Sequence, residues 1–134
     1  MRNFQLLDSV EDDAGTGILT FTSADDAGSS PRLALRREGD FLGLSASYGA
    51  LELALRLHHD DVARAVGRLR PVAGLQTSRT VGTGQSSLAL GAQPDGSLLM
   101  RVMLFGDATG HLSLNLELSA DASQALRRWL GAAE

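Results

Sequence analysis

One short segment alternates strictly between leucine and other residues: Leu51-Glu52-Leu53-Ala54-Leu55-Arg56-Leu57. A second segment repeats the pattern: Leu112-Ser113-Leu114-Asn115-Leu116-Glu117-Leu118. In a β-strand every second side chain lies on the same face, whereas a helix would scatter these leucines around its circumference. Burying each set of leucines contributes roughly 6–12 kcal/mol gross, which outweighs the intrinsic helix preference of leucine, a few tenths of a kcal/mol per residue. Both segments are therefore predicted to be half-buried strands.

Each leucine strand runs directly into a segment with helical spacing. The first is followed by His58-His59-Asp60-Asp61 and then by apolar residues three or four positions apart up to Leu69. The second is followed by Ser119-Ala120-Asp121 and a similar apolar pattern up to Leu130. Aspartate and serine are good N-cap residues, and proline cannot continue a helix. We expect Asp or Ser to cap both helices and Pro71 to end the first one.

The same order of elements is predicted twice along the chain. Strands at 18–22, 32–36 and 41–47 precede the first leucine strand, and strands at 75–81, 88–90 and 98–105 precede the second. The sequence therefore predicts one α+β domain, residues 1–134, made of two ββββα halves at about 15–71 and 72–134. Each half is expected to be an antiparallel sheet covered by one helix. Residues 4–10 are expected to add a short edge strand, and residues 11–17 a loop.

The composition is that of an ordinary globular chain. The 134 residues are 43% hydrophobic and 21% charged, with a net charge of −4 and no cysteine. This excludes a disulfide framework and a thiolate metal site. The sequence contains no apolar run of about 18 residues, so no membrane span is predicted. The first residues lack the pattern of a signal peptide. We expect a cytoplasmic bacterial protein. All twelve basic residues are arginines, a bias that we attribute first to a GC-rich coding sequence.

The strand at 98–105 differs from the others because it is apolar on both faces. Leu98, Met100, Val102 and Leu104 share one face, while Leu99, Met103 and Phe105 share the other. A strand that is apolar on both faces is covered on both. We therefore predict a homodimer, or packing of the two halves against each other, through Leu99, Met103 and Phe105.

Neither a catalytic nor a metal site is predicted. His58-His59-Asp60-Asp61 has metal-ligating residue types, but neighbouring histidines point in different directions, so helix capping is the preferred interpretation. The segment Gly82-Thr83-Gly84-Gln85-Ser86-Ser87 has neither the lysine nor the helix of a phosphate-binding loop, and a hairpin turn is expected there. The chain has no nucleophile-elbow pattern and no poised acid–base pair. We expect no enzymatic activity and no cofactor.

Arginines on the open faces of the sheets are the best candidates for binding. Sheet-face binding of single strands needs basic side chains together with aromatic rings for base stacking. The candidates are Arg32, Arg36 and Arg56, with Phe41 and Tyr48 as stacking residues.

The tandem order of strands and helices resembles the Whirly and Pur-alpha type of single-stranded DNA-binding domain. The resemblance spans nearly the whole chain and lies in the two leucine strands, 51–57 and 112–118, each followed by a helix. It implies a single-stranded nucleic-acid ligand. The competing interpretation is a protein-binding module, such as a small acidic dimer of the type III secretion chaperone kind.

Overall fold

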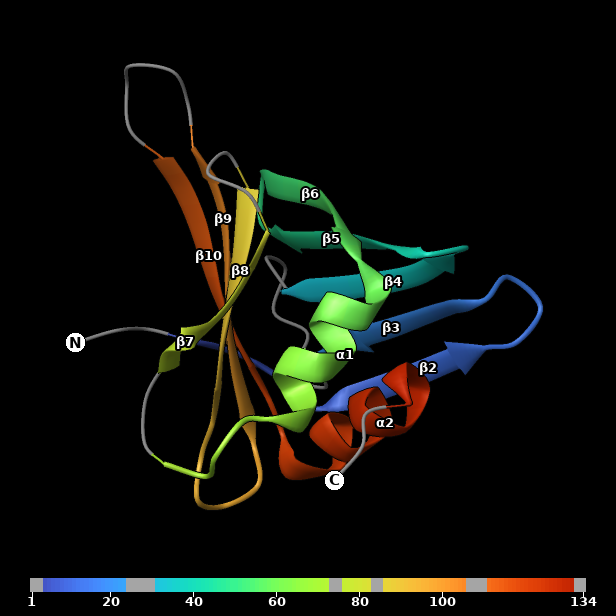
Figure 1. Cartoon of the computed structure of the whole chain (residues 1–134). Coiled ribbons are helices and arrows are strands. Elements are labelled where there is room, and N and C mark those ends of the chain that lie inside the picture. The colour runs from blue at the N-terminus through green and yellow to red at the C-terminus, as the bar shows by residue number, and fades with distance from the viewer. Residues whose placement is uncertain (1–3, 24–30, 73–75, 83–85, 106–110, 132–134) are drawn as a thin grey trace.

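The computed structural model describes residues 4–23, 31–72, 76–82, 86–105 and 111–131 (Figure 1). Two sheets and two helices make up this part of the chain. Sheet B has the strand order β2-β3-β4-β5-β6, and sheet A has the order β1-β10-β9-β8-β7. The predicted α+β class is confirmed.

Sheet B is antiparallel throughout and precedes the first helix. Its strands are β2 (Ser9–Asp13), β3 (Ile18–Thr22), β4 (Arg32–Glu38), β5 (Phe41–Tyr48) and β6 (Leu51–His58), followed by α1 (His59–Gly67). The predicted leucine strand is confirmed: Leu53, Leu55 and Leu57 are buried, and the residues between them are exposed. The predicted loop at 11–17 is wrong for its first part, because β2 continues to Asp13 in register with β3.

Sheet A is mixed, because its first strand is parallel to its neighbour. The strands are β7 (Gln76–Gly82), β8 (Ser86–Ala92), β9 (Leu98–Phe105) and β10 (His111–Leu118), followed by α2 (Ala120–Leu130). The strand β1 (Gln5–Leu7) joins the far side of β10 in parallel. The second leucine strand is therefore confirmed as β10, and it lies inside the sheet rather than at its edge.

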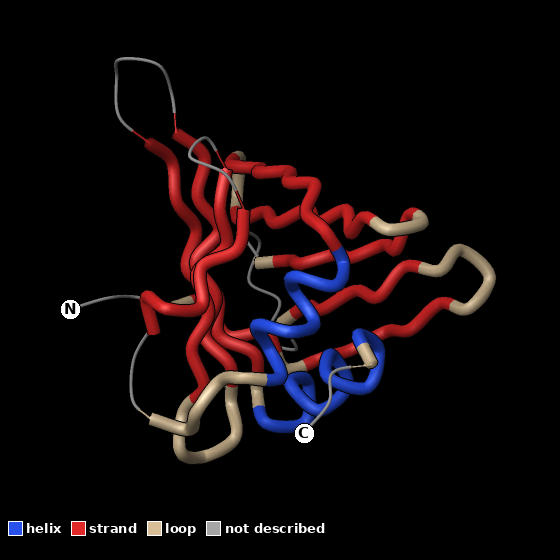
Figure 2. Tube along the Cα trace, in the orientation of Figure 1, coloured by secondary structure: helices blue, strands red, loops and turns tan. Residues whose placement is uncertain are grey.

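The two sheets share one hydrophobic core, and both helices help to close it. In Figure 2 the strands of sheet A run across those of sheet B, with both helices on one side of the junction. Helix α1 contacts β6 and β7, and α2 contacts β10 and β2, so each helix touches both sheets. The prediction that each helix covers one sheet is wrong, because each helix contacts both sheets. A helix of 9 or 11 residues is too short to cover a five-stranded face, so the sheets also cover each other.

The N-terminal segment ties the two sheets together. β1 belongs to sheet A and β2 to sheet B, and Asp8 alone separates them. Leu7 is fully buried at this corner. The Leu7 carbonyl accepts a hydrogen bond from the Ser119 N–H, and the Asp8 N–H donates to the Thr22 carbonyl, both at 3.0 Å. One short stretch of backbone therefore binds both the entry to α2 and the end of β3.

The two helices end differently. In α2 the Ser119 side chain accepts a hydrogen bond from the Ala122 N–H at 3.2 Å, and Gly131 closes the helix with a left-handed φ of 70°. In α1 the N-cap is His58, which makes no side-chain capping bond, so capping by Asp60 or Asp61 is wrong. These aspartates lie in the first turn, where their charge suits the helix dipole.

The predicted end of α1 also shifts. The helix ends at Gly67, before Pro71, and its C-cap residue Arg68 is right-handed. The Arg127 guanidinium of α2 donates a hydrogen bond to the Val66 carbonyl at 3.2 Å. The same carbonyl also accepts a hydrogen bond from the Leu69 N–H at 3.3 Å, so Arg127 adds a second donor from the other helix.

Candidate functional site

The outer face of sheet B is the first candidate surface. Leucines at alternate positions of β4, β5 and β6 are buried and form the inner face of the sheet, which packs on the core. The positions between them form the outer face, which holds four of the five residues predicted to bind nucleic acid. These are Arg32 and Arg36 on β4, Phe41 on β5 and Arg56 on β6. All three arginines are exposed, and Phe41 is half-buried.

Two of these arginines flank a glycine on the neighbouring strand. Arg36 pairs in register with Gly43, and Gly43 pairs with Arg56. The next row across the sheet, Ala34, Ser45 and Ala54, is also small. A shallow hollow of about 300 Å³ results, and it is lined by Ile18, Ala34, Leu35, Arg36, Glu38, Gly43, Leu44, Ser45, Ala54 and Leu55. The hollow is mainly apolar and has a guanidinium group at its rim.

An aromatic and cationic cluster adjoins the same row. The rings of Phe41 and His58 lie with their centroids 4.8 Å apart and their planes inclined by 32°. The Arg56 guanidinium carbon lies 4.4 Å from the centroid of Phe41, a cation–π contact. His58 therefore supports the ring of Phe41, a role that the sequence does not indicate. The contact places the Arg56 guanidinium over Phe41, beside the row through Gly43.

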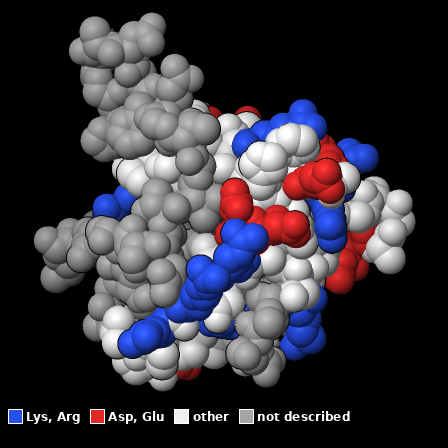
Figure 3. Space-filling view, in the orientation of Figure 1, with Lys and Arg blue, Asp and Glu red and all other residues white. Residues whose placement is uncertain are grey.

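Acidic residues border the outer face of sheet B. Glu52 on β6 accepts a hydrogen bond from the Ser45 hydroxyl at 3.4 Å. Glu38 lines the hollow at the end of β4, and Glu11 and Asp13 lie on β2. The basic groups are thus concentrated in the row through Gly43. On the helix side of the molecule, seen in Figure 3, basic and acidic side chains of the described residues are intermixed.

Tyr48 does not join the other predicted binding residues. It follows Leu42, Leu44 and Ala46 in the alternation of β5, and so lies on the side of the strand opposite Phe41. It pairs with Leu51 at the end of the sheet and is 38% exposed. Residues 41 and 48 are seven positions apart, an odd number, and this spacing alone predicts opposite faces.

The predicted interface residues lie on β9, between β8 and β10 in sheet A. Leu99 is only 3% exposed within a single chain, so its burial needs no partner subunit. Met103 is half-buried. Phe105 lies outside the residues whose side chains are described. The homodimer stays a prediction.

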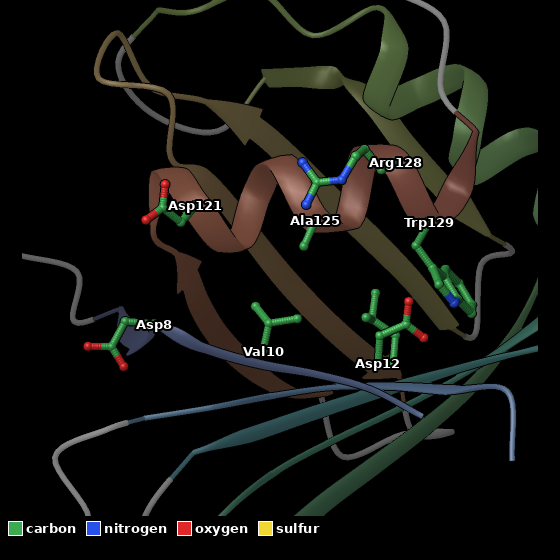
Figure 4. Close-up of a pocket in the computed structure, with 8 residues that line it drawn as sticks. Asp8, Val10, Asp12, Asp121, Ala125, Arg128 and Trp129 are labelled. Atoms are coloured by element: carbon green, nitrogen blue, oxygen red, sulfur yellow. The ribbon is translucent and has the colours of Figure 1, made fainter. Parts of the chain in front are cut away.

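A groove between α2 and β2 is the second candidate surface, and the sequence analysis missed it (Figure 4). It measures about 530 Å³ and is lined by Asp8, Val10, Asp12, Leu19, Asp121, Ala125, Arg128 and Trp129. Asp8, Val10 and Asp12 are alternate residues at and just before β2, Leu19 belongs to β3, and the α2 residues follow one helical stripe. No periodicity within either element reveals the groove, because it arises only where the two meet.

Ionisable groups give little indication of catalysis. Within the described ranges, no three His, Cys, Asp or Glu side chains are placed to share a metal ion. His59 is buried, with its Nδ1 3.5 Å from an Asp60 carboxylate oxygen, whereas His58 is exposed. Hydrogen bonds from the Ser97 N–H and hydroxyl to Asp95, at 3.0 and 2.7 Å, hold the pKa of that carboxyl below its ordinary value. This group lies in the turn between β8 and β9 and has a structural explanation.

Comparisons with known proteins identify no relative: no family model, curated protein or solved structure matches this chain. No helix in the described part of the chain has the length and apolar character needed to cross a membrane.

Proposed function

We propose that the protein binds single-stranded nucleic acid on the outer face of sheet B. The observation that carries the proposal is the row Arg36–Gly43–Arg56, in which two exposed arginines flank Gly43 and Arg36 lines the adjoining hollow. Arg32 and Phe41 share the same face. Phosphate groups would contact the arginines, and a base would lie over the hollow beside the Phe41–Arg56 pair. Arginine planes and aromatic rings both stack on bases without requiring a particular sequence.

The number of arginines favours single strands over duplex DNA. Three guanidinium groups bordered by carboxylates give a small basic footprint, whereas duplex binding usually relies on a larger one. If all three neutralise phosphates, the logarithm of affinity should fall with the logarithm of salt concentration with a slope of about −2. The proposal therefore predicts weak binding that is lost at moderate salt.

The decisive experiment is a fluorescence-anisotropy titration of a labelled oligothymidine at low salt. Arg36→Ala/Arg56→Ala should weaken binding about tenfold or more, because both charges of the central row are lost. The matched control is Arg64→Ala/Arg68→Ala, which removes the same charge from α1. No binding at tens of micromolar protein, or equal losses in the two double variants, would contradict the proposal.

A second variant tests the hollow without removing charge. Gly43→Val should weaken binding by filling the hollow. A Cβ at this position would meet Glu38 Oε2 at 3.6 Å and the Arg36 carbonyl at 3.7 Å, which is ordinary contact, and valine favours strands. Circular dichroism should therefore report an intact fold. Unchanged oligonucleotide affinity in the folded variant would exclude the hollow from the site.

We also infer that the chain is a tandem ββββα arrangement of the Whirly and Pur-alpha kind. The order β3–β6 then α1, followed by β7–β10 then α2, supports the predicted halves at 15–71 and 72–134. β1 and β2 precede this repeated unit. Under this inference they are additions that join the two sheets.

A further inference from the structure

The groove between α2 and β2 suits a ligand different from the one proposed for the outer face of sheet B. Its α2 side spans Asp121 to Trp129, eight residue steps, or about 12 Å along a helix. Its other side spans Asp8, just before β2, to Asp12, four steps, or about 13 Å along a strand. The two walls match in length and run in the same direction (Figure 4). The groove therefore has the length of about four residues of extended peptide.

The floor of the groove is apolar but not closed by packing. Val10 on β2 is 39% exposed, and the α2 residue above it is Ala125, too small to cover it (Figure 4). Trp129 adds an aromatic wall at one end. An occupant with a small apolar side chain would bury Val10 between the strand and the helix.

Sheet B ends at β2, which has β3 as its only strand neighbour among the described residues. An edge strand presents backbone donors and acceptors to an added strand, and strand addition is a common mode of peptide recognition. The groove is lined by one face of this edge strand, through Val10 and Asp12, and by Leu19 of β3. An extended peptide could therefore bond to β2 while its alternate side chains enter the groove.

The charges around the groove and β2 indicate which kind of peptide would bind there. The groove is lined by the carboxylates of Asp8, Asp12 and Asp121 and by one cation, Arg128. The opposite face of β2 adds Glu11 and Asp13. A second copy pairing through β2 would bring these acids against each other, which is destabilising across strands. A peptide rich in arginine or lysine would meet opposite charge on both faces.

We propose that the groove between α2 and β2 binds an extended, positively charged peptide segment of a partner protein, which adds a strand to β2. Asp12 and Asp121 recognise its basic side chains, and Val10 and Ala125 accept a small apolar one. The proposal is independent of the nucleic-acid proposal, because the two surfaces share no lining residue.

The test uses a fluorescein-labelled octapeptide in which arginine alternates with valine, titrated into the full chain. A peptide with glutamate in place of arginine is the charge control. The arginine peptide should bind and the glutamate peptide should not. Asp12→Asn/Asp121→Asn should weaken binding about tenfold, because two charge contacts are lost. Asp60→Asn/Asp61→Asn changes the net charge equally, in the first turn of α1, and should leave affinity unchanged. Equal losses of affinity in both double variants would mean that the peptide responds only to the net negative charge of the protein, and would overturn the proposal.

Two further readouts identify the site itself. Bound peptide should shift the amide resonances of Ser9–Asp13 and slow their hydrogen exchange, which attraction elsewhere would not do. Ala125→Leu should fill the groove and weaken binding about tenfold while the melting temperature is kept, since leucine is nearly as good a helix former as alanine. Binding that survives Ala125→Leu in the folded protein, or shifts confined to other strands, would contradict strand addition at β2.

Discussion

The outer faces of the two sheets differ sharply. On sheet B, the outward residues of β6 are exposed and the inward leucines are buried. On sheet A, β8 is buried along nearly its whole length, and Leu99 on the outward side of β9 is 3% exposed. Sheet B therefore has an open outer face, whereas the outward side of sheet A is buried along β8 and at Leu99 and half-buried at Arg101 and Met103. The same pattern of alternating leucines occurs in both sheets and does not by itself reveal which sheet is open.

The helices show a related difference. α2 has a side-chain N-cap and a glycine C-cap, and it donates the Arg127 hydrogen bond to the end of α1. α1 has neither of these caps. α2 thus has hydrogen bonds and caps at its ends that α1 lacks, and sheet B, next to α1, has the open outer face. Substitutions in sheet A and α2 should cost more stability than matched substitutions in sheet B and α1.

The largest expected effect is at Leu99. Leu99→Ala should lower the free energy of unfolding by about 2–5 kcal/mol, because it removes a buried side chain and leaves a cavity. Ser45→Ala, at an outward position of sheet B, should change it by less than about 0.5 kcal/mol. Urea denaturation of both variants measures the difference. Similar small costs at the two positions would mean that Leu99 is not buried in solution.

The next effect is at the contact between the helices. Arg127→Met keeps most of the aliphatic stem but removes the hydrogen bond to the Val66 carbonyl, and should cost about 1–2 kcal/mol of unfolding free energy. Arg128→Met, at the exposed neighbouring position, should cost less than about 0.5 kcal/mol. Thermal denaturation compares them. Equal melting temperatures would show that α2 does not stabilise α1 through this bond.

A smaller effect separates the two helix N-termini. Ser119→Ala removes the cap of α2 and should cost about 1 kcal/mol. It should also speed hydrogen exchange at the Ala122 N–H. His58→Ala removes no capping bond from α1, so exchange in the first turn of that helix should stay the same. Faster exchange there would show that His58 caps α1 in solution.

The smallest effect concerns the turn of sheet A that contains Asp95. Its pKa is depressed, so its contribution to stability is present above the unfolded pKa of about 3.9 and is lost as pH falls through the lower folded value. Ser97→Ala removes the hydroxyl donor but leaves the backbone donor. The pKa of Asp95, followed by NMR titration, should therefore rise without fully reaching its ordinary value. An unchanged pKa would assign the depression to the backbone bond alone.

Local pattern predicted much of this fold. Strict alternation located β6 and β10, and apolar spacing located both helices, because each pattern matches the period of its element. The second part of β2 was missed because Glu11, Asp12 and Asp13 show no apolar alternation, although they pair with β3. The parallel pairing of β1 with β10, and the helices shared between sheets, depend on contacts that no local pattern contains.

The candidate site was predicted in part for the same reason. Arg32, Arg36, Arg56 and Phe41 fall on one face because their spacing within each strand, and the short hairpins between strands, fix their orientation. The hollow at Gly43 requires knowledge of register between strands. The groove between α2 and β2 joins residues more than a hundred positions apart, such as Asp12 and Asp121, and could not be foreseen.

The N-terminal corner also bears on how the chain folds. Gln5 pairs with Leu116, a separation of 116 − 5 = 111 residues in a chain of 134. During synthesis β1 therefore cannot take its place in sheet A until the chain has been made through β10. Contacts between such distant residues carry a large entropy of loop closure and are associated with slow folding. Because β2 follows Asp8 directly, we expect the pairing of β1 with β10 also to fix the position of β2, and with it the orientation of sheet B relative to sheet A.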